Sequence, residues 1–166
     1  MVSPPITTDS VWELLREIED PEIPVINIVE LGVIRDVTLQ DEKVTVTITP
    51  TYSGCPAMQM IEANINAQLE QNGVQNFEVK TVISPAWTTD WLTDEAKQKL
   101  KNYGIAPPEK TTSDKTALFK DGQRKVACPF CDSENTELKS QFGATACKSL
   151  YFCNECVQPF EHFKCH

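Results

Sequence analysis

The hydrophobic residues near the N-terminus recur at the spacing of a helix: Val11, Leu14, Leu15 and Ile18. Ser10 and Glu13 have the spacing of a capping box, so this helix is expected to begin near Asp9 or Ser10. The sequence Asp20-Pro-Glu-Ile-Pro is expected to end it, because a proline disfavours the helical conformation at the residue before it.

Two further helices are predicted from their end signals. One covers about residues 56–71, since a proline suits its first turn and Gly73 is placed to end it. The other is capped by Thr93 or Asp94 and ends before Gly104.

Alternation of apolar and polar residues predicts strands between these helices. In the segment 44–49, valine and isoleucine alternate with threonine, which is the period of a half-buried strand. The segment 33–40 precedes it across three polar residues, so the two are expected to form a β-hairpin, and a third strand is expected near 77–83. The order α-β-β-α-β-α predicts an α+β domain in which helices cover a small mixed sheet.

Two Cys-x-x-Cys pairs near the C-terminus are the most specific motif of the chain. The pairs Cys128-Pro-Phe-Cys131 and Cys153-Asn-Glu-Cys156 are separated by 21 residues, which leaves room for a hairpin. Four thiolates so arranged suit tetrahedral Zn²⁺ with no open position, and a module of about 40 residues needs metal to supplement its small core. The spacing predicts a structural zinc ribbon, with an iron–sulfur cluster as the less favoured alternative.

Two more cysteines, Cys147 and Cys165, accompany the ribbon motif. They could pair with each other, supply a second site for a soft metal, or pack as small apolar side chains. His162 and His166 flank Cys165 and could act as ligands in its place.

The acidic residues are concentrated in the first part of the chain. Residues 1–105 carry 7 basic and 16 acidic side chains, a net charge of −9, whereas residues 106–166 carry 8 of each. A negative surface repels phosphate backbones, so we expect no nucleic-acid partner. No stretch approaches the roughly 20 apolar residues of a membrane helix and no signal-peptide pattern is present, so we expect a cytoplasmic protein without a membrane partner.

Composition also predicts the domain borders. Residues 106–124 are polar and without period, and we interpret them as a linker. This interpretation divides the chain into an α+β domain at 1–105 and a zinc-ribbon module at 125–166.

Cys55 is isolated from the other cysteines, at the expected junction of a strand and a helix. Unpaired backbone N–H groups and the helix dipole stabilise a thiolate there and can lower the pKa of a cysteine, which improves it as a nucleophile or metal ligand. A buried, unreactive thiol is the alternative. No histidine occurs in residues 1–105, so a Cys-His pair within this domain is excluded. Asp20 and Glu22 could approach Cys55 in the fold, or could serve as solvated turn residues.

Two tryptophans, Trp87 and Trp91, lie in the sequence Pro85-Ala-Trp-Thr-Thr-Asp-Trp. We expect them to anchor this segment in the core. The alternative is an exposed patch for a partner, because aromatic residues dominate interface hot spots.

Five segments together resemble a known family. They are Asp20-Pro-Glu-Ile-Pro, Glu30-Leu-Gly, Thr49-Pro-Thr-Tyr-Ser-Gly-Cys-Pro, Pro85-Ala-Trp-Thr-Thr-Asp-Trp and the paired-cysteine ribbon. They resemble the PaaD family, an accessory component of the bacterial phenylacetyl-CoA 1,2-epoxidase system. Residues 9–105 alone also resemble the SufT-like domain family associated with iron–sulfur assembly. In that family a cysteine matching Cys55 and acidic residues matching Asp20 and Glu22 are implicated, so the resemblance implies cofactor-binding roles for these three residues.

The resemblance implies an accessory role in phenylacetate degradation, a branch of aromatic compound catabolism. In that system a di-iron oxygenase epoxidises the ring of phenylacetyl-CoA, and a reductase with flavin and a 2Fe–2S centre supplies electrons. PaaD proteins are implied to assist assembly or maintenance of these centres, with a transient iron or Fe–S cluster at Cys55 and with the oxygenase and reductase subunits as partners. The chain is not expected to be catalytic itself, since it has no Glu-x-x-His pair and no Gly-rich dinucleotide loop. The alternative is a non-catalytic structural subunit of the oxygenase complex.

Overall fold

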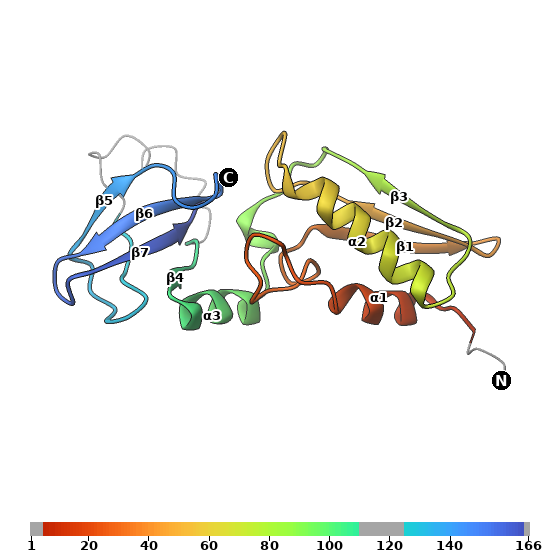
Figure 1. Cartoon of the computed structure of the whole chain (residues 1–166), viewed down its shortest axis with the longest axis horizontal. Coiled ribbons are helices and arrows are strands. Elements are labelled where there is room, and N and C mark those ends of the chain that lie inside the picture. The colour runs from red at the N-terminus through yellow and green to blue at the C-terminus, as the bar shows by residue number, and fades with distance from the viewer. Residues whose placement is uncertain (1–4, 110–124, 165–166) are drawn as a thin grey trace. The chain divides into compact units, whose positions relative to one another are not determined.

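The structure is a computed structural model that describes residues 5–109 and 125–164. The chain forms two compact units, residues 1–87 and residues 88–166, and each is described by itself (Figure 1). The division after residue 87 lies before the predicted border at 105, because the last predicted helix falls in the second unit. Residues 110–124, most of the predicted linker, lie outside the described residues. In the described part of the chain, no helix is long and apolar enough to span a membrane.

The first unit is a small mixed sheet with two helices. Its elements are α1 (Thr8–Arg16), β1 (Ile34–Gln40), β2 (Lys43–Ile48), α2 (Ala57–Gln71) and β3 (Phe77–Thr81). The strand order is β1-β2-β3, in which β1 and β2 are antiparallel and β2 and β3 are parallel. Helix α1 contacts α2 and β1, and α2 contacts β3, so the helices cover one face of the sheet (Figure 1). The predicted α+β class is confirmed.

The predicted hairpin of β1 and β2 turns through two residues. Asp41 has a φ of 48° and Glu42 a φ of 61°. Two successive positive φ values are typical of a type I′ turn, whose twist matches that of the flanking strands. The apolar residues of β2 are buried, as their alternation predicted: Val44, Val46 and Ile48.

Helix α1 begins earlier than the capping pattern predicted. The Thr7 side-chain oxygen accepts the N–H of Ser10 at 3.1 Å, and the Ser10 hydroxyl accepts the N–H of Thr7 at 2.9 Å. Thr7 is therefore the N-cap, and the predicted box of Ser10 with Glu13 was wrong because Ser10 bonds back to Thr7. The helix also ends earlier, at Arg16.

The predicted ends of the other two helices are confirmed. Helix α2 stops before Gly73, which has a φ of 80°, and the helix 94–103 stops before Gly104, which has a φ of 92°. At the start of that last helix, the Thr93 hydroxyl accepts the N–H of Ala96 at 3.0 Å. Glycine suits both C-terminal positions because it adopts a positive φ without strain.

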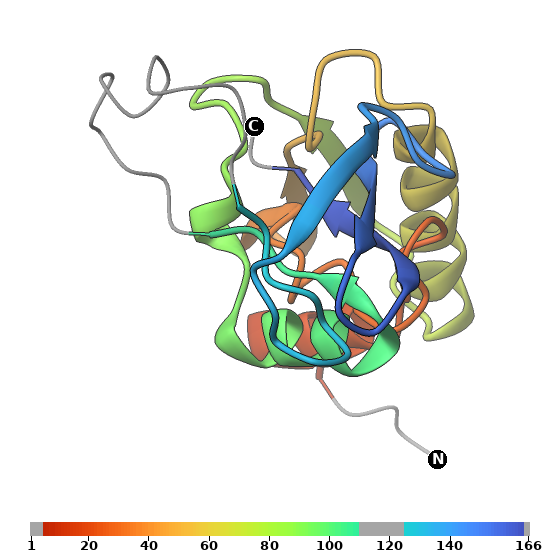
Figure 2. The same ribbon diagram turned by 90° about the vertical axis from the view of Figure 1, so that its left-hand side faces the viewer.

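The second unit is a four-stranded sheet preceded by a helix. Its elements are η1 (Thr89–Trp91), α3 (Asp94–Tyr103), β4 (Ile105–Ala106), β5 (Thr136–Ser140), β6 (Lys148–Cys153) and β7 (Gln158–Phe163). The strand order is β4-β7-β6-β5; the last three strands are antiparallel and β4 is parallel to β7. Figure 2 shows β5 to β7 in shades of blue. The β5–β6 hairpin is the one predicted between the two cysteine pairs.

Strand β4 joins the helix α3 to the ribbon. Ala106 of β4 pairs with His162 of β7. Ala106 is also one of the buried residues of the ribbon's core cluster, whose other members are Val126, Cys128, Tyr151, Cys153 and Phe160. Residues 88–106 therefore group with the ribbon unit, whereas the composition predicts residues 88–105 in the α+β domain.

A substitution in α2 tests the core of the first unit. Ile65 is fully buried, so Ile65→Ala is expected to lower the free energy of unfolding by about 2–5 kcal/mol through lost burial and a cavity. Met60 on the same helix is 56% exposed, and Met60→Ala is expected to cost less than about 0.5 kcal/mol. Urea unfolding followed by circular dichroism measures both. Equal losses in the two variants would contradict this packing.

Candidate functional site

Two turns bring the four predicted metal ligands together. The turn before β5 carries Cys128 and Cys131, and the turn between β6 and β7 carries Cys153 and Cys156. Thr136 at the start of β5 pairs with Cys153, so both turns lie at the same end of the sheet. All four Sγ atoms lie within 4.8 Å of one another.

The spacing of the sulfurs fits one tetrahedral metal ion. The Sγ atoms of Cys128 and Cys156 are 3.6 Å apart, and those of Cys131 and Cys153 are 3.5 Å apart. With metal–sulfur bonds of about 2.3 Å, the sulfurs of a tetrahedral site lie about 3.8 Å apart. The four side chains therefore fit a four-thiolate metal site, and such a site has no open position.

Each turn has a residue in the left-handed conformation directly after its second cysteine. Asp132 has a φ of 58° and Val157 a φ of 57°. In the first turn, the N–H of Asp132 donates to the C=O of Cys128 at 2.9 Å, and the N–H of Cys128 donates to the C=O of Ser133 at 3.0 Å. These bonds close the turn around the sulfurs. The left-handed conformation costs an ordinary residue about 1–2 kcal/mol, and a β-branched residue such as Val157 rarely adopts it.

Two of the four thiols differ in how readily they ionise. The backbone N–H groups of Cys156 and Glu155 donate toward the sulfur of Cys153 and lower the pKa of Cys153 to about 7. Burial, together with the neighbouring thiols, raises the pKa of Cys156 to about 12. Cys153 therefore ionises near neutral pH and more readily than Cys156, which must release its proton as a metal binds.

Helix α3 supports the first cysteine turn through two contacts that the sequence did not predict. The ring of Phe130 lies against Gly104, where an added Cβ would come within 3.0 Å of it. Lys101 forms an ion pair with Asp132, the residue after Cys131. Gly104 was predicted only as a helix stop, because a contact between distant segments leaves no local pattern.

Cys55 is half-buried in the loop between β2 and α2. Its N–H donates to the C=O of Tyr52 at 3.2 Å, and its C=O accepts the N–H of Met58 at 3.3 Å. The Thr51 hydroxyl oxygen lies 3.9 Å from the Cys55 Sγ. Gly54 has a φ of 78°, and an added Cβ there would meet no atom within 4 Å, so the turn's conformation rather than crowding requires glycine. The backbone thus holds the sulfur at the start of α2.

Asp20 shapes the turn that follows α1. Its side chain is 4% exposed, and one carboxylate oxygen accepts the N–H of Glu22 at 2.9 Å and the N–H of Ile23 at 2.8 Å. An aspartate that accepts from backbone groups two and three residues ahead stabilises a local turn. Glu22 itself is half-buried.

The sequence predicted two sites, the four ribbon cysteines and the set of Cys55, Asp20 and Glu22. The structure brings together the ligands of the ribbon site only. Within residues 5–109 and 125–164, the four ribbon cysteines are the one group of three or more metal-ligating side chains whose ligand atoms lie within 4.8 Å of one another. Cys55, Asp20 and Glu22 do not form such a group with one another. Their roles in binding a cofactor stay predictions.

The remaining predicted ligands of the ribbon lie outside the group of four sulfurs. Cys147 is buried, and its Sγ lies 3.0 Å from the Thr145 hydroxyl oxygen. His162 is also buried, on β7. Cys165 and His166 lie outside the described residues. Of the alternatives for Cys147, packing in the interior agrees with its burial.

The two tryptophans differ in burial. Trp87 is 3% exposed, and its ring N–H donates to the C=O of Leu31 at 3.0 Å. Its predicted role as a core anchor is confirmed. Trp91 belongs to η1 and is half-buried.

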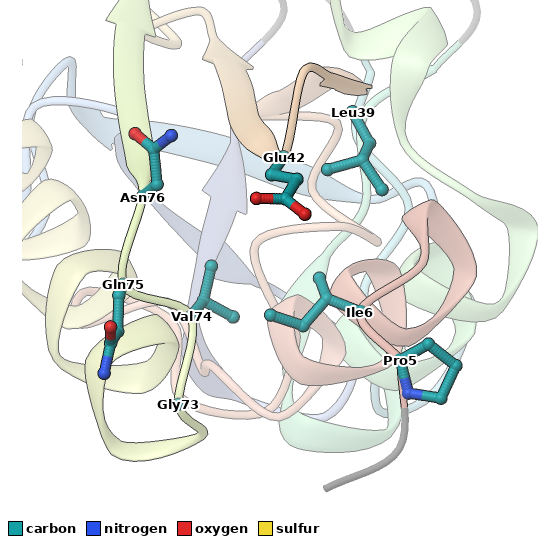
Figure 3. A pocket seen from close by; sticks show the side chains of 8 residues that line it. All are labelled: Pro5, Ile6, Leu39, Glu42, Gly73, Val74, Gln75 and Asn76. Carbon is teal, nitrogen blue, oxygen red and sulfur yellow. The ribbon is translucent and has the colours of Figure 1, made fainter.

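A pocket of about 480 Å³ lies at the end of α2 that is remote from Cys55 (Figure 3). Ile6, Leu39 and Val74 contribute its apolar lining, and Glu42 contributes a carboxylate. Helix α2 has 15 residues and therefore a length of about 22 Å, which separates this pocket from Cys55. The pocket supplies no ligand to the Cys55 site.

Two family models match separate parts of the chain. A model described as an iron–sulfur cluster assembly protein matches residues 8–82, which include Cys55, Asp20 and Glu22. A model described as the PaaD zinc beta ribbon domain matches residues 112–164, which include the four ribbon cysteines. Neither match covers residues 83–111.

Relatives of the chain match its whole length or about half of it. A protein of Escherichia coli, provisionally named as the D component of 1,2-phenylacetyl-CoA epoxidase, is 43% identical over 164 residues, which cover 99% of this chain and 96% of that protein. A Porphyromonas gingivalis protein named Fe-S protein maturation auxiliary factor is 35% identical over 96 residues, covering 57% of this chain and 90% of that protein. The crystal structure of a domain of unknown function from Bacillus anthracis matches with a TM-score of 0.53 and 30% identity, over 56% of this chain and 90% of that one.

Substitution of Asp20 tests its part in the turn that follows α1. Asp20→Ala removes the acceptor of two backbone N–H groups and is expected to lower the free energy of unfolding by about 1–3 kcal/mol. Asp20→Asn keeps an acceptor oxygen and is expected to cost less. Urea unfolding compares the two variants. Wild-type stability of Asp20→Ala would show that the turn does not depend on this carboxylate.

The ribbon site is expected to bind metal more tightly as the pH rises from about 6 to about 8. Thiols must lose their protons to bind, and the pKa values of about 7 for Cys153 and about 12 for Cys156 mean that protons compete throughout this range. Competition with a chromophoric chelator measures the affinity for Zn²⁺ at each pH. Cys131→Ser should weaken binding, whereas Cys147→Ser, outside the group of four, should not. A pH-independent affinity would contradict a thiolate site.

Proposed function

This chain belongs to the PaaD family of 1,2-phenylacetyl-CoA epoxidase components, and from this premise we propose that it assists assembly or maintenance of the iron centres of that multicomponent system. Its relatives support an accessory role. The observation that carries the finer proposal is the position of Cys55. It is a half-buried thiol at a helix start, within the region matched by the iron–sulfur assembly model.

A single thiolate suits a carrier better than a permanent site. Iron in a thiolate site or a cluster takes several ligands, so one sulfur leaves most positions to the ligands of a client protein. In this proposal, Cys55 holds an iron ion or an Fe–S cluster as cargo until client side chains replace it. The Thr51 hydroxyl lies 3.9 Å from the sulfur and can donate to it. Asp20 and Glu22 are proposed to assist the Cys55 site. Asp20 would do so by stabilising the turn in which Asp20 and Glu22 both lie.

The ribbon is proposed to hold a structural Zn²⁺ at Cys128, Cys131, Cys153 and Cys156. The sulfur spacing supports a tetrahedral ion, and four sulfurs complete its coordination. Bound Zn²⁺ supplies no redox chemistry and contributes to folding, because the unfolded chain does not present the four sulfurs together. Metal analysis of the purified protein distinguishes zinc from iron at this site.

The partners are proposed to be the oxygenase and reductase subunits of the epoxidase system. The name of the Escherichia coli relative implies membership of a complex. The net charge of −9 over residues 1–105 favours a client with a basic patch. We place the protein in the cytoplasm, where its thiols stay reduced or metal-bound.

Replacement of Cys55 tests the carrier role. Cys55→Ser is expected to lower the iron content and the ring-epoxidising activity of the oxygenase and reductase isolated from cells, because a serine hydroxyl does not ionise to replace the thiolate. The zinc content of the variant should equal that of the wild type, since the ribbon ligands are unchanged. Mass spectrometry of both metals makes the measurement.

Cys147→Ser is the matched control, because it also removes a thiol that lies outside the four-sulfur group. Its clients should be fully loaded with iron. Full loading in cells that carry Cys55→Ser would reject the carrier role. The alternative, a non-catalytic structural subunit, would then account for the similarity to a protein named as a component of the epoxidase.

A further inference from the structure

Two large apolar side chains are exposed in or beside the cysteine turns. Phe130, between Cys128 and Cys131, is 54% exposed, and Val157, directly after Cys156, is 68% exposed. Because all four Sγ atoms lie within 4.8 Å of one another, both apolar residues belong to the end of the ribbon that surrounds the metal site. Figure 1 shows the β6–β7 turn and the start of β5 at one end of the second sheet.

The presence of valine at position 157 is unfavourable for the isolated fold in two ways. Its φ of 57° is rare for a β-branched residue, and glycine would adopt the same conformation without strain. Its side chain is also largely in solvent, so it contributes little to the core. Backbone strain of this kind is concentrated where a side chain serves binding or catalysis. Since the metal site itself needs only the turn's backbone, the strain points to a use for the exposed side chain.

The surroundings of these apolar residues are negatively charged. Residues 125–135 and 153–158 contain three acidic side chains, Asp132, Glu134 and Glu155, and one basic side chain, Lys125. Lys101 from α3 offsets one of these charges by pairing with Asp132. A divalent ion held by four thiolates adds a net charge of −2. A surface with this charge repels nucleic acid and a second copy of itself, and it attracts a positively charged surface.

We propose that Phe130 and Val157, with the acidic residues Asp132, Glu134 and Glu155, form a docking face for a client protein. The matching surface of the client is an apolar depression bordered by lysine and arginine. This inference deepens the proposed function, on which it rests, by assigning client recognition to the ribbon and cargo to the unit that carries Cys55.

Substitution of Val157 is expected to raise stability and to weaken client binding at the same time, a combination that a purely structural residue would not give. Val157→Gly relieves the strained backbone, so the melting temperature should rise while the metal content stays unchanged. The affinity for the purified oxygenase or reductase subunit should nevertheless fall by about tenfold, because the apolar contact is lost. Val157→Asn tolerates the same φ, removes the apolar side chain, and should behave in the same way. Calorimetric titration of the full-length protein measures the affinity.

A charge reversal and an apolar control complete the experiment. Glu155→Lys should also weaken binding, and raised salt should weaken binding of the wild type. Phe142 is 65% exposed but lies just after β5, at the opposite end of that strand from the cysteine turns, so Phe142→Ala should bind normally. Unchanged binding of both Val157 variants, an equal loss with Phe142→Ala, or no binding of the wild type to either client would overturn the docking face.

The same variants distinguish this inference from the carrier role. If Val157→Gly binds normally while Cys55→Ser still leaves the clients without iron, the docking face is rejected and the carrier role stands. If Val157→Gly binds weakly while Cys55→Ser leaves the clients fully loaded, the docking face stands and the carrier role is rejected.

Discussion

The ribbon unit depends on the convergence of four sulfur atoms from two turns that are distant in sequence. Cys128 and Cys153 are fully buried in the same cluster as Tyr151 and Phe160, so the metal site and the hydrophobic core are a single structure. A core of this size contributes limited stability by itself. A metal that binds only the folded arrangement shifts the equilibrium toward it. The four sulfurs must converge on one metal position. The register of the strands and the positive φ value after each cysteine pair serve this convergence, because they bring sulfurs from two separate segments together.

This requirement also explains why α3 belongs with the ribbon. The first cysteine turn is supported by residues of and after α3, through the contact of Phe130 with Gly104 and the ion pair of Lys101 with Asp132. Ala106 of β4 then extends the sheet beside β7. The two family models cover residues 8–82 and 112–164, so the segment between them includes a structural part of the metal-binding unit.

Local patterns in the sequence predicted most of the elements but not how they group. The hairpin of β1 and β2, the ends of α2 and α3, and the group of four cysteines all have signals within a few residues, namely alternation, glycine and Cys-x-x-Cys spacing. No local pattern in the sequence assigns α3 to the ribbon. Helical periodicity shows which face of a helix is apolar, but not which element packs against that face. The sequence offers a turn role for Asp20 only as one of two alternatives, for a related reason. A carboxylate next to a proline is equally compatible with a solvated cap and with a ligand until its backbone partners are known.

The ribbon site and Cys55 differ in the number of sulfurs that can hold a metal. A metal held by four converging thiolates leaves only when several bonds break together and a buried core opens, so the ribbon retains its ion. Cys55 offers one half-buried sulfur, and in the described part of the chain no group of three ligating side chains includes it. A ligand exchange that replaces one bond at a time proceeds readily from such a site. Retention of a metal at the ribbon and the transfer proposed for Cys55 are therefore compatible within one chain, because ligand count and burial affect how long a metal stays bound.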